Sequence, residues 1–444
     1  MNIKKIDDFA RFYGFHYASI DEDALVDEFR IAMERGLRGE TSSLPMIPSH
    51  IVPASSVPAG KLVVALDAGG TNLRVSRIRF NESGHPEEVL TQRAPMPGTH
   101  GRLGANEFFD ELAAACVPCF EGSPRVEGMG FCFSYEMKVT ESGDGIPIAL
   151  SKEVDAPEII GKSLKEGLKA ALLKRNIPAP ERIVFLNDTT ATLLSGITQI
   201  PPQKFNMKGS TLAQAGKVFG FILGTGINTA YPETSIPKTG FNSEDAPQIV
   251  VAESGGWDFP WQGAFDRGFD ATTKVPGYHT LEKAASGAYL GPLSLYILKQ
   301  AIREKIICFD KSAELLAMEK LETRDLNEFL HNPFSSAFGS FFKSNEMEAL
   351  SATLYLESIL TERAALLAAG IVAGTIEHTG TGYDPLSPAR IAVEGTTFAR
   401  YHHIRESFES RLHSLLCRKK ARFYIVSTVE QASLFGAAVA AACP

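Results

Sequence analysis

The stretch Leu62-Val-Val-Ala-Leu-Asp-Ala-Gly-Gly-Thr-Asn72 joins five apolar residues directly to a glycine-rich turn. Such an apolar run predicts a buried strand, and apolar residues that continue after the turn through Ile78 predict a second one. Gly69 and Gly70 allow the backbone to turn sharply and to bring its amide hydrogens close to an anion. We therefore expect strand, tight turn and strand, with a phosphate site in the turn from Asp67 to Asn72.

Polar side chains around this turn fit a phosphate group and a metal ion. Thr71, Asn72 and Arg74 add a hydroxyl, an amide and a guanidinium as hydrogen-bond donors. Asp67, at the end of the first strand, is placed to hold Mg²⁺ through water, because this hard cation prefers oxygen ligands and keeps part of its hydration shell. The alternative is a plain hairpin with an aspartate in its turn. The added donors favour the phosphate site.

The same arrangement returns 156 residues further along the chain, between two more short apolar runs. The matched residues are Gly60-Lys61 with Gly216-Lys217, Gly70 with Gly226, and Asn72 with Asn228. The second turn, Gly224-Thr225-Gly226, offers a comparable cradle, but Leu223 stands at the position of Asp67, so the expected metal site is one-sided. Two halves built on one plan predict two lobes that face each other across a ligand-binding cleft.

Strands alternate with helical segments along the rest of the chain, so the expected class is α/β. The length of 444 residues argues for two or three domains. Apolar residues make up 44% and charged residues 22%, as in an average globular protein. The most apolar stretches, around 364–376 and 435–443, are shorter than the ~20 residues of a membrane-spanning helix. They predict buried helices.

The charge balance and the N-terminal segment limit the partners and the compartment. Lys and Arg total 44 against 52 Asp and Glu, a formal net charge of −8, which opposes broad attraction to nucleic acid. The N-terminal segment reaches acidic residues before any apolar region, and six cysteines suit a reducing compartment. We expect a cytoplasmic protein with no nucleic-acid or membrane partner.

A carboxylate follows another apolar run, Ile183-Val-Phe-Leu186, in the sequence Asn187-Asp188-Thr189. At the end of a strand it would project at the mouth of the cleft, where Asp188 is the best candidate for a general base. The other role open to Asp188 is the N-cap of the helix expected from Thr190 to Ser195, because aspartate frequently caps helices. The sequence leaves these two roles open.

Several further motifs share their order with a known family. They are Leu44-Pro-Met-Ile-Pro48, Leu66-Asp-Ala-Gly-Gly-Thr-Asn-Leu-Arg-Val75, Gly130-Phe-Cys-Phe-Ser134, Asn187-Asp-Thr189, Gly224-Thr-Gly-Ile-Asn228, Glu282-Lys283 before Gly287-Ala-Tyr-Leu-Gly291, and Val393-Glu-Gly-Thr396. In this order they resemble the eukaryotic-type hexokinase and glucokinase family, over nearly the whole chain. The resemblance implies the two-domain actin-like ATPase (ribonuclease H-like) fold. It places residues 61–190 in a small domain, joined by a C-terminal helix at 430–444, and residues 1–60 with 191–429 in a large domain.

The resemblance also implies the activity, an ATP-dependent transfer of the γ-phosphoryl group to the 6-hydroxyl of a hexose, glucose first of all, as in the first step of glycolysis. Asp188 would be the base and Lys152 would offset the charge of the transferring group. The hexose ligands would be Ser134, Ser151, Lys152, Asn187, Asp188, Asn228, Glu253 and Glu282. The nucleotide and Mg²⁺ positions would be Asp67, Gly69, Gly70, Thr71, Asn72, Arg74, Gly224, Thr225, Gly226, Gly395 and Thr396, with Asp67 holding the metal through water. The expected assembly is a monomer or homodimer.

Four segments depart from the family pattern. Tyr135-Glu136 follows Ser134 where the family has Phe-Pro, and Glu153-Val154 replaces a Gly-Phe pair. Val251-Ala-Glu-Ser-Gly255 replaces Asn-Thr-Glu-Trp-Gly and keeps the carboxylate, and Ala432-Ser-Leu-Phe435 replaces a Gly-Ser-Gly-Lys run. Two other hypotheses are a non-catalytic glucose sensor on the same fold and an actin-like or chaperone-like ATPase. A sensor has no need of Asp188, Lys152 or Asp67, and an ATPase would lack the hexose ligands.

Overall fold

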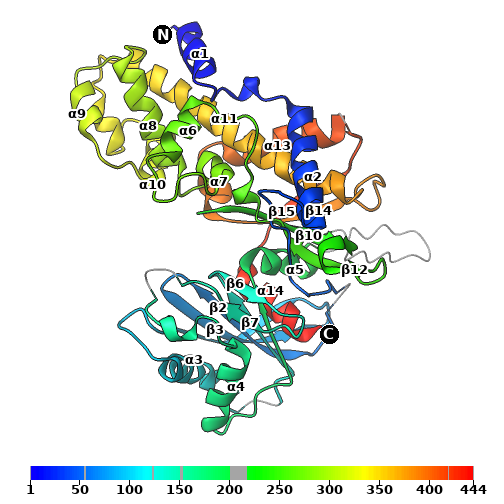
Figure 1. Ribbon diagram of the computed structural model, residues 1–444. Helices are drawn as coiled ribbons and strands as arrows, with labels where there is room; N and C mark the ends of the chain where they lie inside the picture. The colour runs from blue at the N-terminus through cyan, green and yellow to red at the C-terminus, as the bar shows by residue number, and fades with distance from the viewer. Residues whose placement is uncertain are drawn as a thin grey trace.

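The computed structural model describes residues 2–54, 57–122, 125–150, 154–200, 218–418 and 420–443. Its chain forms two lobes, each built on one main sheet, with two helices lying between them (Figure 1). The small lobe contains the sheet of β4 (Pro86–Pro95), β3 (Asn72–Phe80), β2 (Leu62–Gly69), β5 (Gly128–Phe133) and β8 (Arg182–Leu186), in that spatial order. The large lobe contains the sheet of β1 (Ile47–Pro48), β13 (Gln248–Val251), β10 (Ile227–Glu233), β9 (Val218–Leu223), β14 (Ala389–Glu394) and β15 (Tyr424–Thr428).

The two sheets repeat one topology. In the small lobe β2 pairs antiparallel with β3 and parallel with β5, which pairs parallel with β8. In the large lobe β9 pairs antiparallel with β10 and parallel with β14, which pairs parallel with β15. β2 begins at Leu62 and β9 begins at Val218, the 156-residue spacing of the repeat. The internal repeat predicted from the sequence is confirmed.

Two helices exchange between the lobes. α5 (Asp188–Gln199) begins where the small-lobe strand β8 ends, yet it packs on β9 and β14 of the large lobe. α14 (Ala432–Ala442) begins after the large-lobe strand β15, yet it packs on β5 and β2 of the small lobe. The expected domain boundary at residue 190 therefore falls inside a helix that joins both lobes.

The exchanged helices approach each other and the sheets very closely. A Cβ atom added to Gly436 of α14 would lie 2.0 Å from the backbone oxygen of Ala191 in α5. A Cβ added to Gly130 of β5 would lie 1.9 Å from the backbone oxygen of Ala437. Glycine is required at both positions because any side chain would push backbone away from backbone. Gly436 thus sets how closely α14 approaches α5, and Gly130 sets how closely α14 approaches the small-lobe sheet.

The other helices cover the outer faces. In the small lobe α3 (Ala105–Phe120) and α4 (Leu164–Lys174) pack together beneath the sheet (Figure 1). The remaining helices belong to the large lobe: α1 (Ile3–Phe12), α2 (Glu22–Arg38), α6 (Ala264–Asp270), α7 (Thr280–Ala285), α8 (Leu290–Arg303), α9 (Ser312–Ala317), α10 (Thr323–His331), α11 (Met347–His378), α12 (Thr396–Arg400) and α13 (Ile404–His413). Two small hairpins complete the strands: β6 (Met137–Val139) with β7 (Gly145–Pro147), and β11 (Ser235–Ile236) with β12 (Phe241–Asn242).

α11 is much longer than the helix predicted around 364–376. It runs for 32 residues, and among the described residues it is the one helix long and apolar enough to cross a membrane by length and composition. Of its most apolar window, 94% is buried inside the protein. Its buried Arg363 forms two hydrogen bonds, of 2.9 and 2.7 Å, with the carboxylate of Asp266 in α6. This helix is thus the central core element of the large lobe, and the expected short length was wrong.

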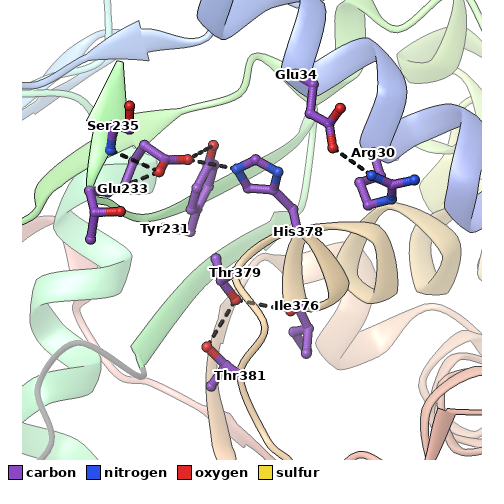
Figure 2. A network of polar contacts seen from close by, with 10 residues as sticks. Arg30, Glu34, Tyr231, Glu233, Ser235, Ile376, His378, Thr379 and Thr381 are labelled. Atoms are coloured by element: carbon purple, nitrogen blue, oxygen red, sulfur yellow. Dashed lines mark hydrogen bonds and ion pairs between the residues drawn. The ribbon is translucent and has the colours of Figure 1, made fainter. Parts of the chain in front are cut away.

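A buried polar network joins the end of α11 to the far end of β10. Figure 2 shows the Tyr231 hydroxyl and the His378 ring both directed at the Glu233 carboxylate. The distances to Glu233 Oε2 are 3.0 Å from the Tyr231 hydroxyl and 2.6 Å from His378 Nε2. Burial acts to raise the pKa of Glu233, but His378, the Ser235 amide and the Tyr231 hydroxyl outweigh it and lower that pKa from its usual 4.5. The network stabilises the folded state by holding an ionised carboxylate.

Replacing Glu233 tests this network through the pH dependence of stability. Because the pKa of Glu233 is lowered in the folded state, the contribution of its charge to stability is complete above pH 4.5. This contribution is lost as the pH falls through the folded-state pKa of Glu233. We expect Glu233→Gln to lower the free energy of unfolding at neutral pH by roughly 2 kcal/mol, and the deficit to shrink in acid. Urea unfolding at several pH values measures this deficit, and Glu328→Gln, at an exposed position, is the control. A deficit that does not change with pH would contradict the role of the charge.

The close approach of α5 and α14 makes a second prediction. Alanine at Gly436 improves helix propensity, but its Cβ would meet a backbone oxygen, so we expect Gly436→Ala to destabilise the protein by about 1–3 kcal/mol. Thermal and urea unfolding measure the loss. Ala438→Gly in the same helix is the control, because it creates no close contact and costs about 1 kcal/mol of helix propensity. A Gly436→Ala protein as stable as the wild type would show that α5 and α14 can move apart at this crossing without loss of stability.

Candidate active site

The first predicted phosphate turn is a tight two-residue hairpin. Gly69 pairs with Asn72 across it, so only Gly70 and Thr71 form the turn, and Gly70 has a φ of 60° that favours glycine. The turn expected from Asp67 to Asn72 is therefore shorter than predicted, because β2 and β3 remain paired up to the glycines. Gly69, Gly70, Thr71 and Asn72 are all exposed, and a Cβ added to Gly70 would meet nothing within 4 Å. This tip is open to a ligand.

The second turn lies against the segment predicted to hold adenosine. Gly224, Thr225 and Gly226 join β9 to β10, and the carbonyl of Gly224 accepts a 2.8 Å hydrogen bond from the Thr397 hydroxyl. Gly395 has a φ of 131°, and a Cβ there would lie 2.2 Å from the backbone oxygen of Leu223. Exposed Thr396 follows it at the start of α12. The structure thus brings together two predicted nucleotide segments that are about 170 residues apart in the sequence.

Asp188 starts α5 but does not cap it. The cap is Asn187, whose Oδ1 accepts a 2.8 Å hydrogen bond from the Thr190 amide. The Asp188 carboxylate accepts from the Thr189 amide at 2.8 Å and from the Thr189 hydroxyl at 3.3 Å, both through Oδ1. The N-cap role that the sequence left open for Asp188 belongs to its neighbour. Thr189 therefore holds the Asp188 carboxylate at the strand end, and this carboxylate does not serve as the helix cap.

Carboxylates from both lobes converge on Asp188. Its negative charge contributes to raising the pKa of each of four neighbours, although burial is the largest cause for every one of them. They are Asp67 on β2, Glu253 after β13, Glu282 in α7 and Glu394 at the end of β14. Burial also raises the pKa of Asp188. Asp188 is the common neighbour of the predicted metal carboxylate and of two predicted hexose carboxylates.

The predicted hexose ligands of the large lobe are held in fixed positions. Asn228 donates to Glu253 through Nδ2 at 3.3 Å, and its Oδ1 accepts from the Ser254 amide at 3.0 Å. Glu253 adopts a left-handed φ of 57°, and its pKa is raised to about 7 by burial, Asp188, Glu282 and Glu136. A Cβ added to Gly226 would lie 2.6 Å from Glu282 Oε2. The second turn therefore lies against a predicted hexose carboxylate as well as against the predicted adenosine segment.

Other predicted residues have different surroundings. Arg74 forms two 2.9 Å hydrogen bonds with Glu88 on β4, so a phosphate would have to compete with this carboxylate. Ser134 is exposed at the end of β5, and a Cβ added to Gly69 would lie 3.7 Å from its hydroxyl. Tyr135, in a segment that departs from the family pattern, donates to the Gly70 carbonyl. Ser151 and Lys152 lie outside the described residues, so their roles stay predictions.

Sequence reasoning missed Glu394. It selected Gly395 and Thr396 from the same motif, but the structure adds the carboxylate before them to the group around Asp188. The available signal was its place directly after the apolar run Ile391-Ala-Val393, where Asp67 also stands relative to its own strand.

Comparison with known families gives this arrangement its context. One family model described as hexokinase matches residues 218–443, which is half of the chain, and a second one with the same description matches residues 11–198. The chain belongs to the hexokinase family. Among its relatives, hexokinase-1 of Oryza sativa subsp. japonica is 28% identical over 441 residues, covering 92% of this chain and 85% of that protein. The hexokinase of Schistosoma mansoni is 24% identical over 451 residues, covering 97% and 95%.

Solved structures agree with the family. The structure described as hexokinase from Schistosoma mansoni complexed with glucose matches with a TM-score of 0.74 at 22% identity, over 99% of both chains. Another hexokinase crystal structure matches with a TM-score of 0.74 at 20% identity, over 98% of this chain and 99% of that one. These hexokinases share the two-lobed arrangement, so the predicted actin-like ATPase fold is confirmed.

The helix that carries Glu282 depends on a buried ion pair. Lys283, the next residue in α7, reaches Asp270 at the end of α6 and donates to the backbone oxygen of Val275 at 2.7 Å. The Lys283 side chain is 7% exposed and that of Asp270 is 17% exposed. Burial acts to raise the pKa of Asp270, but Lys283 and the Gly277 amide outweigh it and lower that pKa. The pair fixes the orientation of α7 and hence of Glu282.

We expect Lys283→Met to cost about 3–5 kcal/mol of stability, because it leaves a carboxylate without its buried partner. Urea unfolding measures this loss. Lys320→Met is the control, since Lys320 pairs with Glu322 at the surface, where solvent screens the ion pair. Equal stability of the two variants would show that the buried pair does not hold α7.

Proposed function

We propose that this hexokinase family member transfers the γ-phosphoryl group of ATP to the 6-hydroxyl of a hexose, with glucose as the first candidate. The single observation that carries the proposal is that Asp188 interacts electrostatically with Asp67 of the small lobe and with Glu253 and Glu282 of the large lobe. The glucose bound by the Schistosoma mansoni hexokinase supports the choice of hexose. A base that faces a predicted hexose site on one side and a predicted phosphate site on the other suits this transfer.

Asp188 takes the proton from the 6-hydroxyl in this proposal. Burial raises its pKa, which brings the carboxylate closer to the pKa of an effective base at neutral pH. The two hydrogen bonds from Thr189 hold Oδ1, and we assign the proton transfer to Oδ2. Glu253, Glu282, Asn187 and Asn228 would orient the hexose, since carboxylates and amides match the many hydroxyls of a sugar.

The two glycine-containing turns, one in each lobe, are suited to bind the phosphate groups of a nucleotide. Backbone and hydroxyl groups are available to phosphate at the open hairpin tip formed by Gly70 and Thr71. They are also available where the second turn contacts Gly395. Among the described residues no group of three or more histidine, cysteine or acidic side chains can hold a metal ion. A single carboxylate, Asp67, suits Mg²⁺ held through water. When bound, Mg²⁺ and ATP supply the phosphoryl group and offset its charge.

Replacement of Asp188 by asparagine tests the proposal. Asparagine keeps the shape and the acceptor for Thr189 but cannot take a proton, so we expect kcat to fall by about 10²–10⁴ while glucose still binds. A coupled assay of ADP release with a panel of hexoses measures kcat, and calorimetry measures glucose binding. Asp325→Asn on α10 serves as the control. Near-normal turnover by Asp188→Asn would overturn the assignment of the base, and a folded wild type that binds glucose without forming its 6-phosphate would indicate a sensor.

A further inference from the structure

The predicted hexose carboxylate Glu253 stands where the pairing of β10 with β13 ends. The last backbone hydrogen bond runs from the Ala252 amide to the Thr229 oxygen, at 2.9 Å. Glu253 then adopts a φ of 57° and a ψ of 48°, in the left-handed region, which is strained for a residue with a side chain. Such a conformation persists only where the surrounding structure holds it. The direction of the Glu253 side chain therefore depends on the contacts around this bend.

A pair of buried hydroxyl groups joins the two sides of the bend. The Oγ1 atom of Thr229 and the Oγ atom of Ser254 lie 2.7 Å apart, and these residues are 2% and 0% exposed. Ser254 belongs to one of the segments that depart from the family pattern, at the position of its tryptophan. A buried hydroxyl without a partner is costly, so each of the two groups stabilises the other. This hydrogen bond fastens the residue after Glu253 to the neighbouring strand β10.

The Asn228 side chain forms a second connection across the same bend. Its Oδ1 accepts from the Thr229 amide at 2.8 Å and from the Ser254 amide at 3.0 Å, so it holds both residues of the hydroxyl pair. Its Nδ2 donates to Glu253 Oε1 at 3.3 Å. The hydroxyl pair thus fixes the backbone on which this contact with the carboxylate depends.

The next residue brings the second predicted hexose carboxylate against the bend. A Cβ atom added to Gly255 would lie 3.1 Å from Glu282 Oε2 and 3.0 Å from the backbone oxygen of Ile227. The segment 253–255 therefore carries one of the two carboxylates and lies against the other. A shift of this short segment would change the separation of two groups that are expected to bind one hexose.

We propose that the hydroxyl pair of Thr229 and Ser254 positions Glu253 relative to Glu282 and thereby sets the affinity for the hexose. The inference rests on the proposed function, because it needs a hexose at these carboxylates. Both hydroxyls are buried and act through the backbone of Glu253, so the two residues are positioning residues. Asp188 is held separately by Thr189 in α5, and we therefore expect the pair to affect hexose binding more than phosphoryl transfer.

Four variants isolate the hydroxyl pair. Thr229→Val removes one hydroxyl and nearly keeps the shape of the side chain, and Ser254→Ala removes the other. Thr229→Ser is the conservative variant that keeps the hydroxyl. Thr375→Val is the matched control, since Thr375 is also 2% exposed and its hydroxyl donates to the Ile371 backbone oxygen at 2.8 Å, inside α11. Thr229→Val and Thr375→Val both lose a buried hydroxyl, so only a difference in glucose binding reports on the site.

Calorimetric titration with glucose measures the proposed role directly. We expect the Kd for glucose to rise about three- to tenfold in Thr229→Val and in Ser254→Ala, and to stay within about twofold of the wild type in Thr229→Ser and Thr375→Val. Because the two hydroxyls form one hydrogen bond, the double variant should lose about as much as the weaker-binding single variant. An unchanged Kd in both single variants, an equal rise in Thr375→Val, or independent losses in the double variant would overturn the inference.

Steady-state kinetics separate hexose binding from the chemical step. The KM for glucose should rise by the same factor as the Kd, while kcat and the KM for MgATP stay within about twofold of the wild type. A lower kcat with an unchanged KM for glucose would overturn the inference. A wild type that binds glucose more tightly than Thr229→Val but forms no glucose 6-phosphate would contradict the proposed function and support the positioning role. A folded wild type that binds no hexose would overturn both.

Discussion

The contact on which the rest of the structure depends is the crossing of α5 and α14, where Gly436 meets the backbone of Ala191. Each helix starts at the last strand of one sheet and packs on the sheet of the other lobe. This exchange turns the ends of both sheets toward one junction, so that Asp188 stands beside Asp67 and also beside Glu253 and Glu282. A residue larger than glycine at the crossing would separate those groups, because backbone atoms lie on both sides and cannot yield as a flexible side chain would.

Charge is the second constraint at this junction. Four buried or half-buried carboxyl groups lie within electrostatic reach of Asp188, and burial raises the pKa of all five. The pKa values of Glu253 and Glu394 are raised to about 7, well above the 4.5 of an ordinary glutamate. A raised pKa lowers the repulsion among neighbouring carboxyl groups at neutral pH, because the uncharged form of each becomes more populated. The site can therefore concentrate acidic groups without holding five full negative charges.

The sequence predicted the features that depend on local patterns. The apolar runs with glycine turns revealed β2–β3 and β9–β10, and their repetition predicted two sheets of one topology. Features that depend on contacts between distant segments were missed. The pairing of Arg74 with Glu88 was missed because no pattern indicates it, and the length of α11 was underestimated because polar residues such as Arg363 are satisfied by a distant partner, Asp266. Glu394 was missed for the same reason, since its neighbours Asp188 and Asp67 lie on other elements.

The duplicated plan also explains why the site is asymmetric. The repeat matches Asp67 with Leu223, so the predicted metal carboxylate of the small lobe has an apolar counterpart in the large lobe. The strand registers match Glu394, which pairs with Ile222, to Phe131, which pairs with Leu66. Each lobe thus contributes one strand-end carboxylate at a position where the other lobe has an apolar residue. The two turns are therefore not equivalent in the proposed transfer: only the small lobe offers a strand-end carboxylate, Asp67, for the expected Mg²⁺, whereas Asp188, the proposed base, interacts with the strand-end carboxyl groups of both lobes.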